Sequence, residues 1–232
     1  MRVVFVHGAC VRDGQWWWHP AADALLKRGM SSVAPALPSC GESDRPPGND
    51  GPGLAEDIAA VRAALTGSDE PTILVGHSYG GIVAAEAAVG APAVQHMVFL
   101  SSYLPEPGES LSTFGAPEPP PFLDFDPESG TFGAVPELFA ETFMQDCPPQ
   151  LTREGEHRLI RQTIAVTQQP VRQVAWHDTP TTYIVCADDR GTPAAAQREF
   201  SRRADKVIEV QTGHHPFLSQ PDTIADILSS LA

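Results

Sequence analysis

A serine flanked by two glycines carries the clearest chemical signal in this sequence. Ser78 lies two residues after Gly76 and two before Gly80, in the run Leu-Val-Gly-His-Ser-Tyr-Gly-Gly. The apolar stretch Pro71–Val75 precedes this run and the alanine-rich stretch Ile82–Val89 follows it, which predicts a strand, a sharp turn and a helix. Such a turn strains the serine backbone and leaves no room for a β-carbon at either glycine. The pattern therefore predicts a nucleophilic hydroxyl at a helix N-terminus, although an ordinary strand-to-helix turn can show the same five residues.

A serine hydroxyl is a weak nucleophile until a base takes its proton, and two adjacent histidines near the C-terminus could supply that base. His214 and His215 follow the last predicted strand, Lys206–Val210, and Gly213 before them gives the backbone freedom. A loop at the carboxyl end of a parallel strand lies at the same edge of the sheet as the turn that presents the serine. The residues alone leave both histidines as candidates. Four other histidines fall in helical or edge contexts and are expected to be structural or solvated: His19, His96, His157 and His177.

A carboxylate must hold the imidazole in the right tautomer and stabilise its cation, and two aspartates are suitably placed. Asp188 and Asp189 follow the predicted strand Thr181–Cys186 at its carboxyl end. A single aspartate in a loop is usually a turn former or a helix cap. Here the serine and the histidines are predicted at the same edge of the sheet, which favours a catalytic role for one of these aspartates.

The oxyanion that forms during acyl transfer needs amide donors, and the first predicted strand ends in a suitable turn of small residues. The turn is His7-Gly8-Ala9. We expect the backbone N–H groups of Ala9 and Tyr79 to form the donor pair. The loss of one such donor typically lowers turnover by ~10²–10³.

Predicted strands and helices alternate along most of the chain. This alternation predicts an α/β protein with a mostly parallel central sheet and helices on both faces. The predicted strands are Arg2–Val6, Ser32–Ala36, Pro71–Val75, Val94–Leu100, Thr181–Cys186 and Lys206–Val210. The predicted helices are Pro20–Lys27, Leu54–Leu65, Ile82–Val89, Pro193–Arg203 and Asp222–Leu231.

The alternation breaks down between residues 103 and 176. Prolines crowd the stretch Pro105–Pro136, so neither a central strand nor a long helix can run through it. Two helices are predicted after it, near Pro136–Gln145 and Thr152–Gln168. A disordered linker is the alternative, but the many phenylalanines supply more apolar surface than a solvated linker needs. We therefore predict an α/β core of residues 1–102 and 177–232 with an inserted cap of residues 103–176.

The bulk composition limits the partners of this protein. A length of 232 residues suits one domain with a sizeable core. The net charge of −14 argues against nucleic acid and against an anionic membrane surface as partners. No apolar run approaches the length that crosses a bilayer, and the strand-like N-terminus does not resemble a secretory signal. We expect a cytoplasmic monomer or homodimer with four reduced, scattered cysteines, namely Cys10, Cys40, Cys147 and Cys186.

No cofactor is expected. The acidic residues Glu42, Asp44 and Asp50 lie in a loop rich in proline and glycine and lack the spacing of metal ligands. Two adjacent histidines alone are too few for a metal site. The sequence contains neither a Gly-x-Gly-x-x-Gly motif nor a phosphate-binding loop, so a nucleotide cofactor is not expected.

In combination, these motifs resemble those of α/β-hydrolase-fold enzymes. The resemblance is closest to the group of plant methyl-ester esterases, hydroxynitrile lyases and bacterial carboxylesterases of the pyrethroid-hydrolase kind. The matching pieces cover nearly the whole chain except the predicted cap: Phe-Val-His-Gly-Ala-Cys, Val-Gly-His-Ser-Tyr-Gly-Gly, Val-Phe-Leu-Ser-Ser-Tyr-Leu-Pro, Tyr-Ile-Val-Cys-Ala-Asp-Asp-Arg and Gly-His-His-Pro-Phe-Leu-Ser-Gln-Pro.

The resemblance implies a role for individual residues. The group places its catalytic histidine seven residues before a proline, which selects His214 because Pro221 then fits. It places its acid three residues after the Gly or Cys that ends a strand, which selects Asp189. The oxyanion amides of the group map onto Ala9 and Tyr79. Hydroxynitrile lyases of this group carry a lysine directly after the catalytic histidine, and His215 at that position disfavours the lyase function.

The sequence thus predicts a serine hydrolase that cleaves a small, mostly apolar or aromatic carboxylic ester through an acyl-enzyme on Ser78. One alternative uses the same triad as a lactonase, a C–C hydrolase or a hydroxynitrile-lyase-like enzyme. Another is a non-catalytic ligand receptor built on the same scaffold. The residues predicted to line the substrate pocket are Trp16, Trp18, His77, Tyr103, Leu104 and His215.

Overall fold

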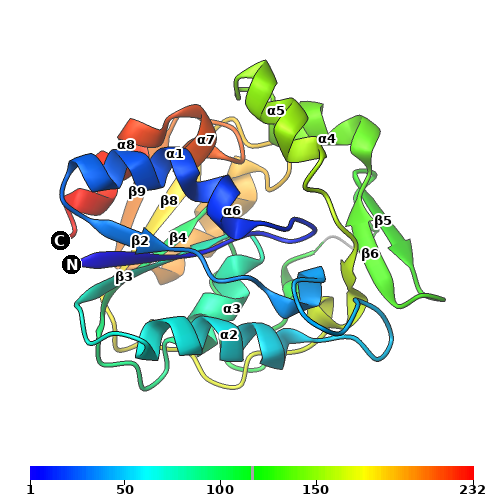
Figure 1. The fold of residues 1–232 in the computed structure, drawn as a ribbon, viewed down its shortest axis with the longest axis horizontal. Coiled ribbons are helices and arrows are strands. Elements are labelled where there is room, and N and C mark those ends of the chain that lie inside the picture. Colours follow the sequence, from blue (N-terminus) through cyan, green and yellow to red (C-terminus); the bar gives the residue numbers. More distant parts are fainter. Residues whose placement is uncertain (116–117) are drawn as a thin grey trace.

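A parallel sheet of six strands forms the centre of the molecule, in the order β2-β1-β3-β4-β8-β9 (Figure 1). The structure is a computed structural model that describes residues 1–115 and 118–232. Residues 116–117, which fall within the predicted cap, lie outside the described residues. The strands are β1 (Arg2–Val6), β2 (Ser31–Val33), β3 (Thr72–His77), β4 (Val94–Leu100), β8 (Thr181–Cys186) and β9 (Lys206–Val210).

The order of the strands brings the ends of β1 and β3 together. From β1 the chain passes to β2 at one edge of the sheet and then returns to β3 on the other side of β1. The register pairs Val6 of β1 with Gly76 of β3, just before Ser78. The loops that follow these two strands therefore meet at one carboxyl edge, where ligands of open α/β sheets bind.

Helices cover both faces of the sheet, as the alternation of elements predicts. Figure 1 shows α1 (Gly14–Lys27), α7 (Pro216–Ser219) and α8 (Pro221–Ser229) on one face, and α2 (Leu54–Thr66) and α3 (Gly80–Ala87) on the other. The helix α6 (Ala194–Phe200) packs against β8. Because successive side chains of a strand point to opposite faces, β1 supplies both layers of the core. Val4 and Val6 pack with α2 and α3, whereas Val3 and Phe5 pack with α1 and α8.

The first helix begins earlier than the predicted helix Pro20–Lys27. It starts at Gly14, with the Asp13 carboxylate accepting a hydrogen bond from the backbone N–H of Trp16. The prediction was wrong because it treated Pro20 as a helix start, whereas Pro20 lies inside α1. The carbonyl of Trp16, which a proline four residues later cannot bond, instead accepts a hydrogen bond from Nδ1 of His19.

The segment between residues 103 and 176 is largely folded into elements of its own. An antiparallel sheet joins β5 (Leu123–Asp126), β6 (Thr131–Ala134) and β7 (Gln162–Thr163), and two short helices, α4 (Pro136–Phe143) and α5 (Pro149–Glu156), accompany it. Figure 1 shows these elements, apart from the unlabelled β7, at the end of the central sheet away from the N-terminus. The remaining short 3₁₀ turns of the chain lie at Pro38–Cys40, Leu111–Phe114, Ile164–Thr167 and Ser201–Arg203.

One sequence expectation for this segment was wrong, and one feature of it was not predicted. The predicted helix Thr152–Gln168 ends at Glu156, because residues 162–163 pair with β6 instead of continuing the helix. The apolar spacing that suggested a long helix also fits an extended strand followed by a short turn. The hairpin of β5 and β6 was not predicted. Its two strands contain no proline, and Pro127 lies in the turn between them. The phenylalanines do pack, with Phe132 and Phe139 almost fully buried.

The helices and the cysteines bear on two further expectations from the sequence. In residues 1–115 and 118–232, no helix combines the length and the apolar character needed to cross a bilayer. The four cysteines all lie in these ranges and are free thiols.

Candidate active site

The turn between β3 and α3 holds Ser78 in a strained conformation. Its backbone φ is 51°, in the left-handed region that side chains with a β-carbon rarely occupy. A β-carbon at Gly76 would lie 2.7 Å from the Cα of Gly81, and one at Gly80 would lie 2.3 Å from the carbonyl oxygen of Val6. The two flanking glycines are therefore required by the close approach of strand to helix, as the spacing predicted.

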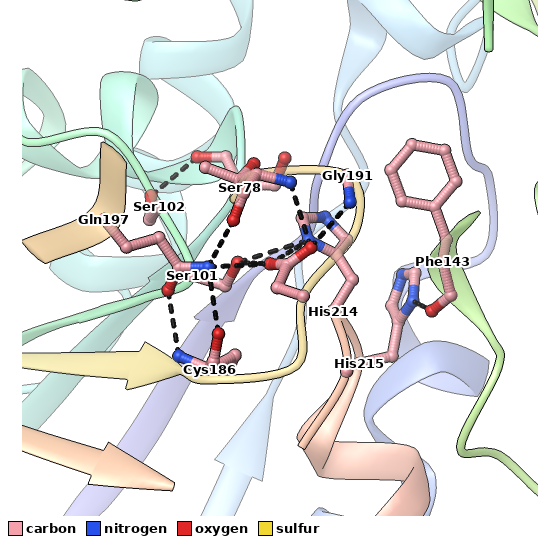
Figure 2. Close-up of polar contacts among 12 residues, drawn as sticks. Ser78, Ser101, Ser102, Phe143, Cys186, Gly191, Gln197, His214 and His215 are labelled. Carbon is pink, nitrogen blue, oxygen red and sulfur yellow. Dashed lines mark hydrogen bonds and ion pairs between the residues drawn. The ribbon is translucent and has the colours of Figure 1, made fainter. Parts of the chain in front are cut away.

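Five donors converge on the carboxylate of Asp189, which lies in the loop after β8. Four of the donor residues, Ser101, Gly191, Gln197 and His214, are labelled in Figure 2. Its Oδ1 accepts hydrogen bonds from the backbone N–H groups of two following residues, and its Oδ2 accepts from three side chains. The donors are Gly191 N at 2.8 Å, Thr192 N at 2.9 Å, Gln197 Nε2 at 2.9 Å, His214 Nδ1 at 2.8 Å and the hydroxyl of Ser101. The carboxylate is thereby fixed in one orientation, facing the imidazole of His214.

These contacts keep Asp189 ionised despite its burial. Burial alone raises the pKa of the carboxyl, but the charge and hydrogen bond of His214, with the hydrogen bonds of Ser101 and Thr192, outweigh it and hold the pKa below its ordinary value. The neighbouring Asp188 is exposed, and its backbone carbonyl accepts a hydrogen bond from Gln145. Only Asp189 of this pair of aspartates therefore contacts the histidine.

The imidazole of His214 is oriented for proton transfer at its outer nitrogen. Because Nδ1 donates to the carboxylate of Asp189, the neutral ring carries its lone pair on Nε2. The ring is buried, and His214 lines the same cavity as Ser78. The strained Ser101, with a φ of 43°, places its hydroxyl 3.2 Å from Nδ1 of His214. Residues that follow β4 and β8 thus hold His214, which lies in the loop after β9.

Two backbone N–H groups at the cavity are those of the residues predicted as oxyanion donors. Ala9 and Tyr79 both line the cavity beside Ser78. Within the described residues, the backbone N–H groups of Ala9 and Tyr79 have no protein acceptor. Gly8 permits the close approach, because a β-carbon there would lie 3.1 Å from the β-carbon of Ser78.

A chain of buried hydrogen bonds connects Tyr79 with Cys10, the residue directly after Ala9. The hydroxyl of Tyr79 donates to Asp57 Oδ2 at 2.6 Å, and the hydroxyl of Ser39 donates to the same oxygen at 2.5 Å. Gln162 of β7 donates to the Ser39 hydroxyl at 2.8 Å and accepts from the backbone N–H of Cys10 at 3.0 Å. Cys10 directly follows Ala9 and has a φ of 60°. We refer to Cys10, Gln162, Ser39, Asp57 and Tyr79 as the buried polar chain.

Sequence reasoning missed the supporting residues of this site. Burial raises the pKa of Asp57, and hydrogen bonds from Ser39 and Tyr79 offset part of that effect. The sequence does contain a sign of Asp57, because this acidic residue stands next to Ile58 within the helical apolar pattern of Leu54–Leu65. Gln162, Gln197 and Ser101 carry no comparable signal, because their roles depend on contacts with distant segments.

The cavity beside Ser78 is lined mainly by apolar side chains, several of them from the segment 103–176. Of the six residues predicted to line it, His77, Tyr103 and His215 do so. The apolar lining side chains are Ala9, Cys10, Val11, Leu111, Phe122, Leu123, Phe132, Ala134, Phe139, Phe143 and Leu159.

The other three predicted lining residues, Trp16, Trp18 and Leu104, lie elsewhere. Because α1 starts at Gly14, Trp18 points into the core, where its ring centroid lies 4.2 Å from that of Phe5 and 3.9 Å from that of Phe217. Trp16 lies under the guanidinium of Arg158, 4.1 Å from the ring centroid. Leu104 is fully buried in the core. The prediction failed because aromatic and aliphatic residues near a site are more often packed in the core than exposed to a pocket.

Three imidazoles come close together at the cavity. One nitrogen each of His77, His214 and His215 lies within 4.8 Å of the others, a group that could in principle hold a metal ion. Each ring, however, already donates an N–H to a protein oxygen, His77 to the carbonyl of His214, His214 to Asp189, and His215 to the carbonyl of Phe143. These hydrogen bonds fix the orientation of the three rings and leave one lone pair on each. A site without a metal stays our prediction.

Known proteins share this sequence pattern and this fold. A model of the alpha/beta hydrolase family matches residues 3–227. Polyneuridine aldehyde esterase of Rauvolfia serpentina is 27% identical over 263 residues, which cover 99% of this chain and 94% of that protein. Methylesterase 1 of Arabidopsis thaliana is 26% identical over 251 residues, which cover 99% of this chain and 95% of that protein. The crystal structure of a pyrethroid hydrolase from Sphingobium faniae JZ-2 has a TM-score of 0.86 at 24% identity, with 99% of this chain and 96% of that chain covered. The resemblance inferred from the motifs is thereby confirmed.

Proposed function

This chain belongs to the alpha/beta hydrolase family, and from that premise we propose that it is a serine esterase acting on small, mostly apolar or aromatic carboxylic esters. One observation carries the proposal. A buried carboxylate fixes Nδ1 of His214, whose Nε2 is then a base at the cavity that contains the strained Ser78. The apolar side chains that line the cavity, among them Leu111, Phe122 and Leu159, support an apolar substrate.

The proposed reaction follows from the roles of these groups. Nε2 of His214 takes the proton of the Ser78 hydroxyl as Oγ attacks the ester carbonyl, and the N–H groups of Ala9 and Tyr79 stabilise the resulting oxyanion. The imidazolium then gives its proton to the leaving alcohol as the C–O bond breaks, which leaves an acyl group on Oγ. Water attacks this acyl-enzyme with His214 again as base, and the acid product and Ser78 are released. Asp189 stays ionised throughout and stabilises the imidazolium.

Covalent labelling tests the nucleophile directly. A fluorophosphonate should add one label per chain, and mass spectrometry of the peptides should place it on Ser78. The neighbouring Ser101 and Ser102 provide internal controls, because their hydroxyls are buried and donate to Asp189 and to the Ser78 carbonyl. A folded protein that takes no label, or takes it on another serine, contradicts the proposal. Lactonase, C–C hydrolase and lyase activities use the same nucleophile and are distinguished by their products, whereas a receptor binds ligands without turnover.

The buried polar chain predicts that a residue remote from the reacting atoms controls turnover. Replacing Gln162 by leucine removes the acceptor that holds the N–H of Cys10, and with it the support for the Ala9 amide. We expect kcat to fall by about tenfold, less than the loss of a whole oxyanion donor, while KM changes little. Steady-state kinetics on p-nitrophenyl acetate would separate the two constants.

The matched control for this change is Gln150→Leu, because Gln150 is an exposed glutamine of α5. Urea unfolding of both variants shows whether the fold is intact at the assay temperature. A Gln162→Leu protein whose kcat stays within twofold of the parent, or whose KM rises while kcat is kept, would show that Gln162 does not position the oxyanion donors.

A further inference from the structure

His215 places a fixed nitrogen at the edge of the candidate active site. Its Nδ1 lies 2.8 Å from the backbone carbonyl of Phe143, which can only accept a hydrogen bond (Figure 2). Nδ1 therefore carries the hydrogen, and the other nitrogen, Nε2, has the lone pair. Within the described residues, Nε2 of His215 makes no hydrogen bond to the protein.

The ring has little freedom to change this arrangement. It is 5% exposed and lies stacked against Trp17, with ring centroids 5.1 Å apart and planes 28° apart. Burial lowers the pKa of His215 to about 3, with the charge of His214 as the next cause, so that the ring stays neutral at neutral pH. A neutral imidazole with its hydrogen committed to Phe143 can offer a ligand only an acceptor.

The surroundings of His215 make this acceptor selective. His215 lines the same cavity as Ser78 and His214, and its ring centroid lies 5.0 Å from that of His214. Many of the other lining side chains, including Phe139 and Phe143, cannot donate a hydrogen bond. An apolar ligand that displaces water from this cavity leaves Nε2 without a partner, which is unfavourable, whereas a ligand with a donor at that point satisfies it.

We infer that Nε2 of His215 is a recognition point that selects esters carrying a hydroxyl or N–H group close to the ester carbonyl. The inference rests on the proposed esterase function, since it names the substrate class of that same cavity. The hydrogen of the ligand's hydroxyl or N–H group points to Nε2 of His215, while the carbonyl carbon faces Ser78. A cavity that hydrogen-bonds a substrate group rejects the analogue that lacks the group more strongly than a hydrophobic wall rejects a missing methylene.

Matched esters test the inference. Methyl mandelate and methyl phenylacetate differ only by one hydroxyl on the carbon next to the carbonyl. We expect the parent protein to favour the hydroxylated ester by about tenfold in kcat/KM. In His215→Phe the ratio should fall to about one, and in His215→Asn, whose amide oxygen can accept, it should be partly restored. The ratio is used because it cancels any general loss of activity from the changed packing.

The control variant is His157→Phe, at an exposed histidine after α5, in which the preference should persist. A parent ratio of one or below, or a ratio that His215→Phe leaves unchanged, overturns the inference.

A second measurement applies even if no ester is turned over, an outcome that would count against the proposed function itself. The Ser78→Ala protein should bind 1-phenylethanol about tenfold more tightly than ethylbenzene, and Ser78→Ala/His215→Phe should bind both equally. Equal binding by the single variant overturns the recognition point independently of catalysis.

Discussion

Replacing Ser78 by alanine removes nearly all ester hydrolysis: we expect kcat on p-nitrophenyl acetate to fall by about 10⁶-fold, as when the serine nucleophile of a comparable triad is lost. Without Oγ no acyl-enzyme forms, and only the amides of Ala9 and Tyr79 remain to polarise the carbonyl. Alanine fits the same turn because it keeps the β-carbon that the strained φ of 51° already accommodates. The variant should therefore unfold at nearly the same urea concentration as the parent protein.

The specificity of this effect is checked with Ser112→Ala, a change at an exposed serine of the segment 103–176. This control should keep full activity. The Ser78→Ala protein should also lose fluorophosphonate labelling, which separates a true loss of the nucleophile from partial inactivation. Residual turnover above about a tenth of the parent value would place the nucleophile elsewhere.

Replacing Asp189 by asparagine should lower kcat by about 10⁴-fold while KM changes little. The asparagine amide can turn a donor toward Nδ1 of His214, which favours the tautomer with its hydrogen on Nε2 and blocks the base. It also removes the negative charge that stabilises the imidazolium. Asp188→Asn is the matched control, because Asp188 is exposed and its side chain lies outside the contact with His214. A loss in Asp188→Asn with none in Asp189→Asn would reverse the assignment.

The same carboxylate should affect how stability depends on pH. The pKa of Asp189 is lower in the folded protein than the value of about 3.9 expected for an unfolded chain. The unfolded chain therefore binds more protons in this range, and the contribution of Asp189 to stability is present above the unfolded pKa and is lost as pH falls through the folded pKa. Urea unfolding between neutral pH and pH 3 should show a shallower loss of stability in Asp189→Asn than in the parent. Equal slopes would mean that the carboxylate is not held ionised.

Much of the architecture was predictable because it depends on local rules. Four strands, Arg2–Val6, Val94–Leu100, Thr181–Cys186 and Lys206–Val210, have the predicted bounds, since short runs rich in β-branched and apolar residues between turn residues specify strands strongly. The elbow was predictable for a steric reason, because only glycine fits where β3 meets α3 and β1. The segment between residues 103 and 176 was less predictable. Residues 162–163 pair with β6, a contact between distant parts of the chain that local periodicity does not contain.

The sequence by itself determined the order of the elements and the presence of a serine, an acid and a histidine at carboxyl ends of strands, because sterics and periodicity act between near neighbours. From the residues alone, both His214 and His215 and both Asp188 and Asp189 remained open. The tertiary structure decided which of them meet, since it turns Asp189 toward His214 and His215 toward the carbonyl of Phe143. It also sent Trp18 into the core and brought Gln162 to Cys10. Such choices depend on packing and on hydrogen bonds between remote segments, which only the folded chain brings into contact.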